Sequence, residues 1–322
     1  MYIYSKYVIF ILTLLSMNIS YSQILDKKED FSRINTSNCD FCLCYMGISP
    51  LDFSGKGIRI DTRYLLLDRL VNNNRVVDNT EESYEKHFTL QLSLIYPVGK
   101  KISVIGIVPY SVREGRESAE EKTSYTSGLG DIILFGRYPV LEKLNVNSIF
   151  LLSAQLGIKL PNGKPDEKNS ANELIDAHLQ IGTGSTDFIG GSNFLYSHKR
   201  FSISSNLLFS VKTRGKTGYK FGNTFNYDIT SKYMLFQSSI GKNMFFINTG
   251  IKGDLRGKES QNGILISNSG GNTLFLTGGF NYFLSPYVSL EAQFMEPVLY
   301  TFNGIQDAES FKFVTGIQFM FY

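Results

Sequence analysis

A two-residue alternation of apolar and polar side chains runs from Gly57 to the C-terminus, in segments of about ten residues. Successive side chains of a β-strand point to opposite faces, so each segment predicts a strand with one apolar and one polar face. The alternation therefore predicts an all-β fold. In the segment 57–67, for example, one face holds Ile58, Ile60, Tyr64 and Leu66, and the other holds Arg59, Asp61 and Arg63.

The connections between these segments alternate between tight turns and long polar loops, which is the rhythm of an up-and-down antiparallel barrel. The long loops are expected at about 68–86, 112–127, 161–176, 255–271 and 297–309. An even count of about 12 strands would bring both ends of the chain to the periplasmic side of the membrane. The predicted strands are 57–67, 87–96, 102–110, 128–139, 149–160, one starting near Ala177, 201–212, 219–238, 243–254, 272–283, 287–296 and 311–322.

The final segment ends the chain on an aromatic residue and has Phe311, Phe313, Ile317, Phe319 and Phe321 on one face. It resembles the aromatic-rich strand that closes bacterial outer-membrane barrels against strand one. We therefore expect a transmembrane antiparallel β-barrel over residues 56–322, located in the bacterial outer membrane. A secreted β-sandwich or jelly roll is the alternative, but it requires neither outward aromatics at the strand ends nor such a terminal strand.

Residues 1–22 have the three parts of a secretory signal peptide. Lys6 supplies positive charge, residues 8–17 form a short apolar core, and Ser20 and Ser22 are small residues before a cut at Gln23. The apolar core is too short to span a bilayer as a helix, and no later segment reaches eighteen apolar residues. The sequence therefore predicts export with removal of residues 1–22.

The composition supports the barrel and excludes some functions. Aromatic residues make up 14% of the chain, and the mean hydropathy is −0.07, as expected when each strand mixes outward apolar with inward polar side chains. The net charge of +3, without a run of basic residues, gives no indication of nucleic-acid binding.

All three cysteines, Cys39, Cys42 and Cys44, fall in the segment 23–55, which is expected to be periplasmic or lumenal. They could form a disulfide that pins this segment, or bind a soft metal such as copper(I) or zinc. They could also serve as a redox pair, or have no defined role. Attached haem is disfavoured because Leu43, not His, follows Cys42.

Two short segments, Gly128-Leu-Gly-Asp-Ile-Ile-Leu-Phe-Gly-Arg-Tyr138 and Gln180-Ile-Gly-Thr-Gly-Ser-Thr-Asp187, resemble signatures of the meta-pathway-of-phenol-degradation family of outer-membrane β-barrel transporters. The resemblance in layout covers most of the mature chain. It implies a channel for small molecules, including apolar or aromatic ones, and brings no established catalytic or ligand residues. The cysteine segment is not a general feature of that family.

The parity of the alternation places a set of charged side chains on inward faces. Because the last strand would close against the first, Lys312 is expected to approach Asp61. The set could form a constriction that selects solutes, or ion pairs that fill and stiffen a narrow lumen, and both roles can coexist. The predicted lumen-lining charged residues are Arg59, Asp61, Arg63, Asp131, Arg137, Lys212, Glu291 and Lys312.

Enzymatic chemistry is not expected. A barrel hydrolase requires a histidine positioned beside a serine or a carboxylate. His87, His178 and His198 fall at strand starts or in a turn, outside any recognisable motif, with only a weak acid/base or metal role conceivable at the rim. The Gly-Thr-Gly-Ser of residues 182–185 lacks the lysine and the strand-to-helix context of a phosphate loop.

The sequence therefore predicts a monomeric channel or transporter for small solutes. Eight strands leave a lumen just filled by side chains and 16 to 18 leave an aqueous pore, so about 12 should give a narrow passage. The expected partners are outer-membrane lipids, the barrel assembly machinery and a small-molecule solute, with no nucleic acid and no enzymatic cofactor. The alternative is a non-transporting scaffold whose Cys39, Cys42 and Cys44 bind a metal or a periplasmic partner.

Overall fold

The computed structural model describes residues 56–80, 82–99, 101–116, 123–169, 171–238 and 243–321. The predicted signal peptide, the segment 23–55 and its three cysteines lie outside the described residues. Among the residues described, no helix is both long and apolar enough to cross a membrane.

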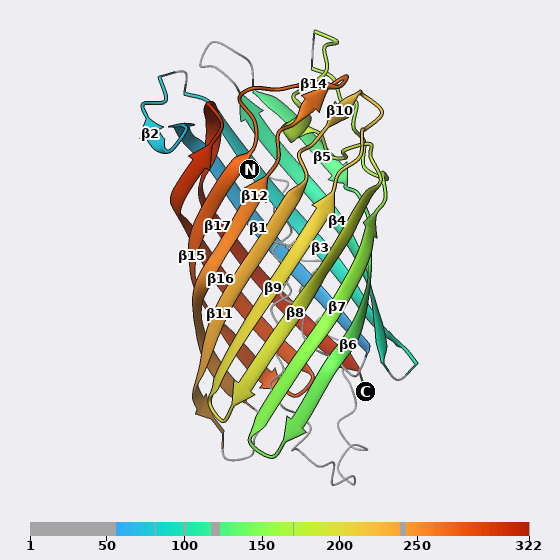
Figure 1. The fold of residues 1–322 in the computed structure, drawn as a ribbon, viewed down its shortest axis with the longest axis vertical. Coiled ribbons are helices and arrows are strands. Elements are labelled where there is room, and N and C mark those ends of the chain that lie inside the picture. Colours follow the sequence, from blue (N-terminus) through green and yellow to red (C-terminus); the bar gives the residue numbers. More distant parts are fainter. Residues whose placement is uncertain are drawn as a thin grey trace, which may run out of the picture. The chain divides into compact units, whose positions relative to one another are not determined.

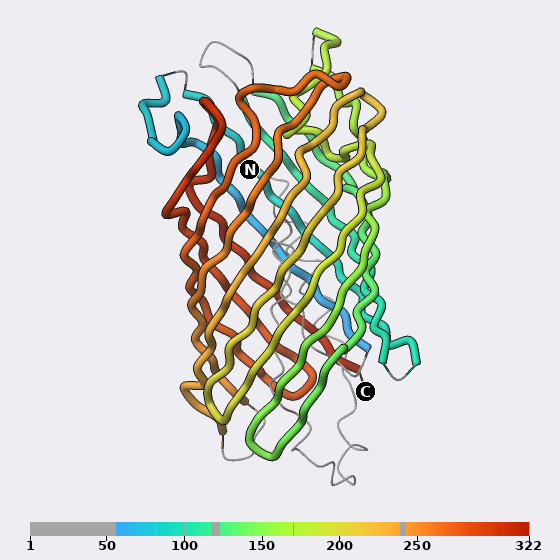
Figure 2. Tube along the Cα trace, in the orientation of Figure 1, coloured from blue at the N-terminus to red at the C-terminus, as the bar shows by residue number. Residues whose placement is uncertain are grey.

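Twelve long strands pair antiparallel with their neighbours, and the last pairs with the first, so that the sheet closes into a barrel (Figure 1). The strands are tilted relative to the barrel axis (Figure 2). The predicted closed barrel of about 12 strands is thus confirmed. The barrel strands are β1 (Lys56–Asn72), β3 (Tyr84–Val98), β4 (Ile102–Arg116), β6 (Ile133–Asn145), β7 (Ser148–Lys159), β8 (Asp187–His198), β9 (Phe201–Val211), β11 (Thr224–Gln237), β12 (Met244–Arg256), β15 (Gly271–Ser285), β16 (Val288–Phe302) and β17 (Ile305–Phe321).

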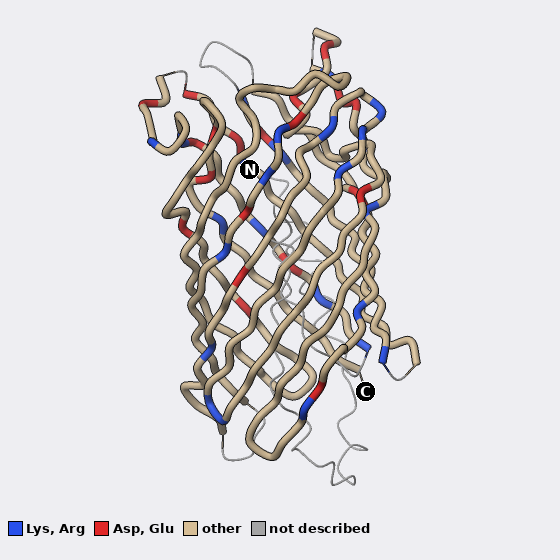
Figure 3. The backbone as a smooth tube through the Cα atoms, in the orientation of Figure 1, with Lys and Arg blue, Asp and Glu red and all other residues tan. Residues whose placement is uncertain are grey.

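Long connections gather at one end of the barrel, here called the loop end, and short turns at the other, the turn end (Figure 1). Charged residues are concentrated at the loop end (Figure 3). Several small elements also lie there. They are β2 (Arg75–Val77), which pairs with β1; β5 (Ser124–Leu129), which pairs with β4; the 3-10 helix η2 (Ala177–Leu179); and a separate sheet of β10 (Tyr219–Lys220), β13 (Ser260–Gln261) and β14 (Ile264–Leu265).

The alternation decides which side chains face outward. In β17, Phe313 and Phe321 are 41% and 50% exposed, whereas Lys312, Val314 and Gln318 are buried. The same pattern recurs in β3, where leucines on the outer face alternate with buried polar residues. Each strand thus presents apolar side chains to the outside and a more polar face to the lumen, as a membrane barrel requires.

Several predicted boundaries were wrong. The predicted long loop 297–309 is instead part of β16 and β17, which are joined by residues 303–304 alone, because Tyr300, Phe302 and Ala308 pack inward with Val71. The sixth strand begins at Asp187 rather than near Ala177, and the fourth is divided between β5 and β6. The eighth begins at Thr224, because residues 219–220 belong to the separate sheet. The physical reason for the late start of β8 is that Gly182 packs on the main chain of Gly163, where a Cβ would clash, so this segment leaves the wall.

The two glycines of β8 do not introduce a bulge into the strand. Gly190 and Gly191 pair in register with both β7 and β9, without a shift. Gly191 instead leaves room for the side chain of Leu208, which would clash with a Cβ there.

Candidate functional site

The connection between β7 and β8, residues 160–186, contacts inward-facing side chains of several strands and is called the lumenal loop here. Its residues Leu179, Gln180 and Ile181 are buried. Arg113, inward on β4, donates hydrogen bonds to the main-chain carbonyls of His178 and Gln180. The loop therefore occupies the barrel lumen near the loop end rather than extending away from it.

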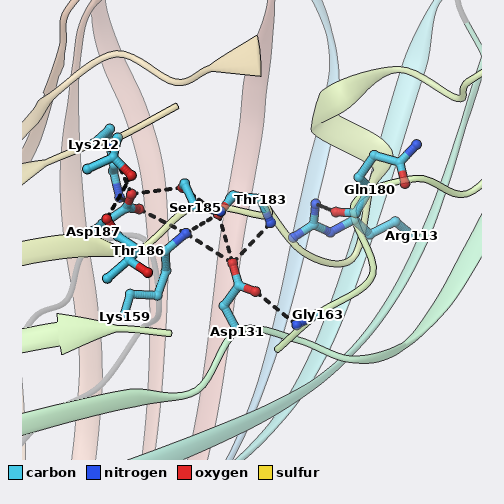
Figure 4. A network of polar contacts seen from close by, with 11 residues as sticks. Arg113, Asp131, Lys159, Gly163, Gln180, Thr183, Ser185, Thr186, Asp187 and Lys212 are labelled. Atoms are coloured by element: carbon cyan, nitrogen blue, oxygen red, sulfur yellow. Dashed lines mark hydrogen bonds and ion pairs between the residues drawn. The ribbon is translucent and has the colours of Figure 1, made fainter. Parts of the chain in front are cut away.

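Asp131 holds the lumenal loop at two points (Figure 4). Its side chain is 6% exposed, in the gap between β5 and β6. One carboxylate oxygen accepts the main-chain N–H of Gly163 at 2.9 Å. The other accepts the main-chain N–H and the hydroxyl of Thr183, at 3.0 and 2.9 Å, and Lys159 Nζ at 3.0 Å. One carboxylate thereby joins both limbs of the loop to the barrel wall.

Asp187, the first residue of β8, extends this contact network. Its fully buried carboxylate lies 2.8 Å from Lys159 Nζ and 3.3 Å from Lys212 Nζ. It also accepts the Ser185 hydroxyl at 2.8 Å and the main-chain N–H of Thr213 at 3.1 Å. Lys159 thus bridges two aspartates. We call Asp131, Lys159, Thr183, Ser185, Asp187 and Lys212 the latch.

The latch brings together the two segments that carry the family resemblance. Asp131 belongs to the first segment, and Thr183, Ser185 and Asp187 belong to the second. They are close because β6, β7, β8 and β9 are neighbours in the sheet and all end or begin at this level. Both segments therefore serve one structural purpose, which is to fix the lumenal loop.

His178, on η2, connects the lumenal loop to the separate sheet. Its Nε2 lies 3.2 Å from a carboxylate oxygen of Glu259, and the Tyr219 hydroxyl donates to the same oxygen. The imidazole ring also meets the edge of Phe221, with ring centroids 5.5 Å apart. Burial lowers the pKa of His178, but the hydrogen bond and charge of Glu259 outweigh burial and raise it well above its ordinary value. Burial raises the pKa of Glu259, but His178 brings it below its ordinary value.

This pair gives a testable pH dependence. The raised pKa of His178 means that its contribution to stability is present at neutral pH and is lost as the pH rises through the raised value. The lowered pKa of Glu259 means that its contribution is lost only as the pH falls below the ordinary value for a glutamate. We expect the imidazole NMR signal of His178 to remain that of the protonated ring at pH 8. In Glu259→Gln the pKa of His178 should fall, because burial is no longer outweighed by that carboxylate. An unchanged pKa in this variant would contradict the assignment.

A cavity of about 130 Å³ lies between the lumenal loop and the barrel wall. The loop contributes His178, Gln180, Ile181 and Thr183 to its lining, and the wall contributes residues from most sides of the barrel. Two of the wall residues, Ile133 and Ile189, belong to an inward-facing cluster that we call the apolar strip. The strip consists of Ile95, Ile105, Ile107, Ile133, Phe135, Ile189 and Leu208.

The structure places the predicted charged residues in separate groups. Arg59 and Asp61 are both buried and pair at 2.6 Å, and Arg59 also reaches Glu291 at 3.2 Å. Arg63 lines the cavity and donates to Thr89 at 3.5 Å.

The remaining predicted residues are Asp131, Lys212, Arg137 and Lys312. Asp131 and Lys212 belong to the latch. Arg137 is buried on β6, outside the residues that line the cavity.

The expected approach of Lys312 to Asp61 was wrong. Lys312 pairs in register with Leu65, whereas Asp61 lies opposite Gly316. Lys312 Nζ instead contacts Asp254 of β12 at 3.0 Å and Glu309 at 3.5 Å. The reason is that a long side chain in a narrow lumen can reach a strand that is not its neighbour in the sheet.

Several residues of the site escaped the sequence analysis. Lys159 could have been found, because it follows the outward Ile158 at the end of a predicted strand. Arg113, Thr183 and Glu259 carried no signal, since each was assigned to a loop or to a misplaced strand. The cysteines lie outside the described residues, so their proposed metal or disulfide role stays a prediction. Within the part of the chain that the structure describes, no group of three or more His, Cys, Asp or Glu could hold a metal ion.

Comparison with known proteins supports the fold. A family model described as "Putative MetA-pathway of phenol degradation" matches residues 68–296. The crystal structure of an outer membrane channel from Pseudomonas putida F1 is similar, with a TM-score of 0.64, 15% identity, and coverage of 84% of this chain and 97% of that chain. The comparison with curated proteins gives no match.

Two further barrels align more distantly. The β-domain of a Bordetella autotransporter has a TM-score of 0.46 at 11% identity, covering 83% of this chain and 100% of that one. A monoaromatic hydrocarbon channel has a TM-score of 0.40 at 10% identity, covering 83% of this chain and 89% of that one. The predicted location in the bacterial outer membrane is confirmed, and the barrel fold is the one seen in the outer membrane channel from Pseudomonas putida F1.

Proposed function

This chain belongs to the MetA-pathway family of phenol degradation, and on that premise we propose that it is an outer-membrane channel for small apolar solutes. The solute would enter the lumen at the loop end, pass the lumenal loop and leave at the turn end. The family name, which refers to phenol degradation, is consistent with an aromatic cargo.

The apolar strip is the observation that carries this proposal. Inward faces of water-filled barrels are polar, because the lumen is aqueous. Here seven inward positions on β3, β4, β6, β8 and β9 are apolar and form one cluster. The strip begins at the cavity, where Ile133 and Ile189 belong to the lining, and continues to Ile95 near the turn end. The seven side chains are 0% to 6% exposed, so an apolar solute would meet this wall of its own polarity by displacing the groups that cover it.

The packing of the strip shows how its bulk is accommodated. The ring of Phe135 lies over Gly157 of the neighbouring strand, where any side chain would clash with it. Leu208 lies over Gly191 in the same manner. These side chains therefore lie flat against the wall and cover its polar backbone.

Replacing Ile107 with Gln tests the proposal, because Ile107 is fully buried on the strip and Gln has nearly the same size. A polar group within the apolar path would raise the free energy of a passing hydrocarbon by about 1 to 2 kcal/mol. Uptake of labelled toluene by expressing cells should therefore fall roughly five- to thirtyfold.

Ile107→Leu is the matched control, since it keeps the surface apolar and should retain uptake. Folding of both variants is verified by the shift in gel mobility on heating. Equal toluene uptake by Ile107→Gln and the unchanged protein would count against a route along the strip.

A further inference from the structure

Basic side chains surround the cavity. They come from β1, β4, β7, β12, the end of β9 and the lumenal loop, so they approach it from several sides. The acidic lining residues in the described part of the chain are Asp131 and Glu259. The basic ones, which we call the collar, are Arg63, Arg113, Lys159, His178, Lys212 and Arg256.

The two acids of the lining are already engaged. Asp131 accepts hydrogen bonds from Gly163, Thr183 and Lys159, and Glu259 accepts from His178 and Tyr219. Both acids thus also hold the lumenal loop. Two further acids outside the lining pair with collar residues: Asp187 with Lys159 and Lys212, and Glu309 with Arg256. Six basic groups thus face these four acids, and the electrostatic potential in the cavity is positive.

Arg113 shows the imbalance most directly. Within the described residues, its guanidinium donates to the main-chain carbonyls of His178 and Gln180, which are neutral acceptors. Both bonds come from one terminal nitrogen of the guanidinium and compensate none of its charge, and the acid that interacts with that charge is Glu85. A cation in a cavity from which bulk water is largely displaced attracts an anion more strongly than it would in water.

The same cavity has an apolar side. Ile133, Ile181 and Ile189 line it together with Phe221, and two of them continue into the apolar strip. A neutral hydrocarbon would use only the apolar side, and a small inorganic anion only the collar. A molecule with one anionic end and one apolar body would satisfy both.

We propose that the cavity binds small monocarboxylates with an apolar body, with the carboxylate at the collar and the body on Ile133 and Ile189. This inference rests on the proposed channel and narrows its solutes to amphipathic acids. Guanidinium groups suit this purpose because their geometry matches a carboxylate.

Equilibrium dialysis of labelled benzoate against the full chain in lipid nanodiscs tests the proposal, with empty nanodiscs subtracted. Benzyl alcohol is the neutral probe of similar shape. Benzoate should bind saturably and about tenfold more tightly than benzyl alcohol, because hydrogen bonds to charged groups are the stronger ones. Sodium chloride should weaken the binding of benzoate only. Equal binding of the two probes would overturn the proposal.

Arg63→Gln is the informative variant, since Arg63 is in the collar but is not part of the latch. It should weaken benzoate binding about tenfold, and Arg63→Lys should restore most of it. Arg137→Gln is the control, because Arg137 also faces inward but does not line the cavity. Equal effects of Arg63→Gln and Arg137→Gln would refute a role for the collar.

Failure of this inference is distinguishable from failure of the channel. If Ile107→Gln loses toluene uptake but the protein does not bind benzoate, the channel proposal is kept and the carboxylate proposal is refuted. If the protein binds benzoate but Ile107→Gln does not change toluene uptake, the carboxylate site is kept and the route along the apolar strip is refuted.

Discussion

Single-channel conductance is expected to rise severalfold when Asp131 is replaced with Ala. The variant removes the carboxylate that accepts the N–H groups of Gly163 and Thr183 and pairs with Lys159. Lys159 keeps Asp187 as its partner, so the cost comes mainly from the main-chain N–H groups of Gly163 and Thr183, at about 1 to 3 kcal/mol for each buried donor left unsatisfied. A loss of that size shifts a closed–open equilibrium of the lumenal loop by about two orders of magnitude or more. The loop would then spend much of its time away from the position that narrows the lumen.

Planar bilayers are the direct measurement, and entry of a large antibiotic into expressing cells is a second one. Asp166→Ala is the matched control, because Asp166 is an exposed acid on the same loop. Asp131→Asn should have an intermediate effect, since it keeps an oxygen that can accept a hydrogen bond. A conductance unchanged in Asp131→Ala would show that the latch does not hold the barrier.

The second large effect is expected on stability, from Lys312→Met. Lys312 Nζ pairs with Asp254 and Glu309, which are both 4% exposed. Arg256 lies 3.4 Å from Glu309 and would remain as a cation beside the two acids. Without Lys312, two neighbouring carboxylates in the lumen would share that one cation. We expect a loss of about 3 to 5 kcal/mol in the free energy of unfolding.

The loss is measured as a lower midpoint of unfolding in guanidinium chloride, starting from protein folded in detergent. Lys258→Met is the control, because Lys258 is exposed in the loop after β12 and its removal should change the midpoint little. If both variants unfold at the same denaturant concentration, the internal ion pairs do not stabilise this barrel.

The charges around Lys312 and Asp61 show where inference from the sequence stops. Parity placed both side chains on inward faces, and both are buried. Their partners could not be obtained in the same way. Lys312 reaches Asp254 on β12, which is not adjacent to β17 in the sheet, so the pairing depends on the tilt of the strands and the width of the lumen. A period of two carries information about faces, but none about contacts across an enclosed space.

The lumenal loop illustrates the same limit. The residues 161–176 were expected to form a long connection, and they do. The residues 177–186 were expected to begin the sixth strand, yet they enter the lumen. Two contacts decide this path. Gly163 packs against Gly182, and Asp131 accepts a hydrogen bond from the main-chain N–H of Thr183. Both contacts join parts of the chain that lie apart in the sequence.

The sequence by itself determined that this chain closes into a 12-stranded membrane barrel and which face of each strand is apolar, because lipid imposes one rule on every outward position. The tertiary structure alone decided the latch, the cavity and the course of the apolar strip. Their residues come from several strands and from a loop that folds back between them. Inward positions follow no such common rule, because the contacts of each inward side chain depend on the groups that the closed barrel places opposite to it.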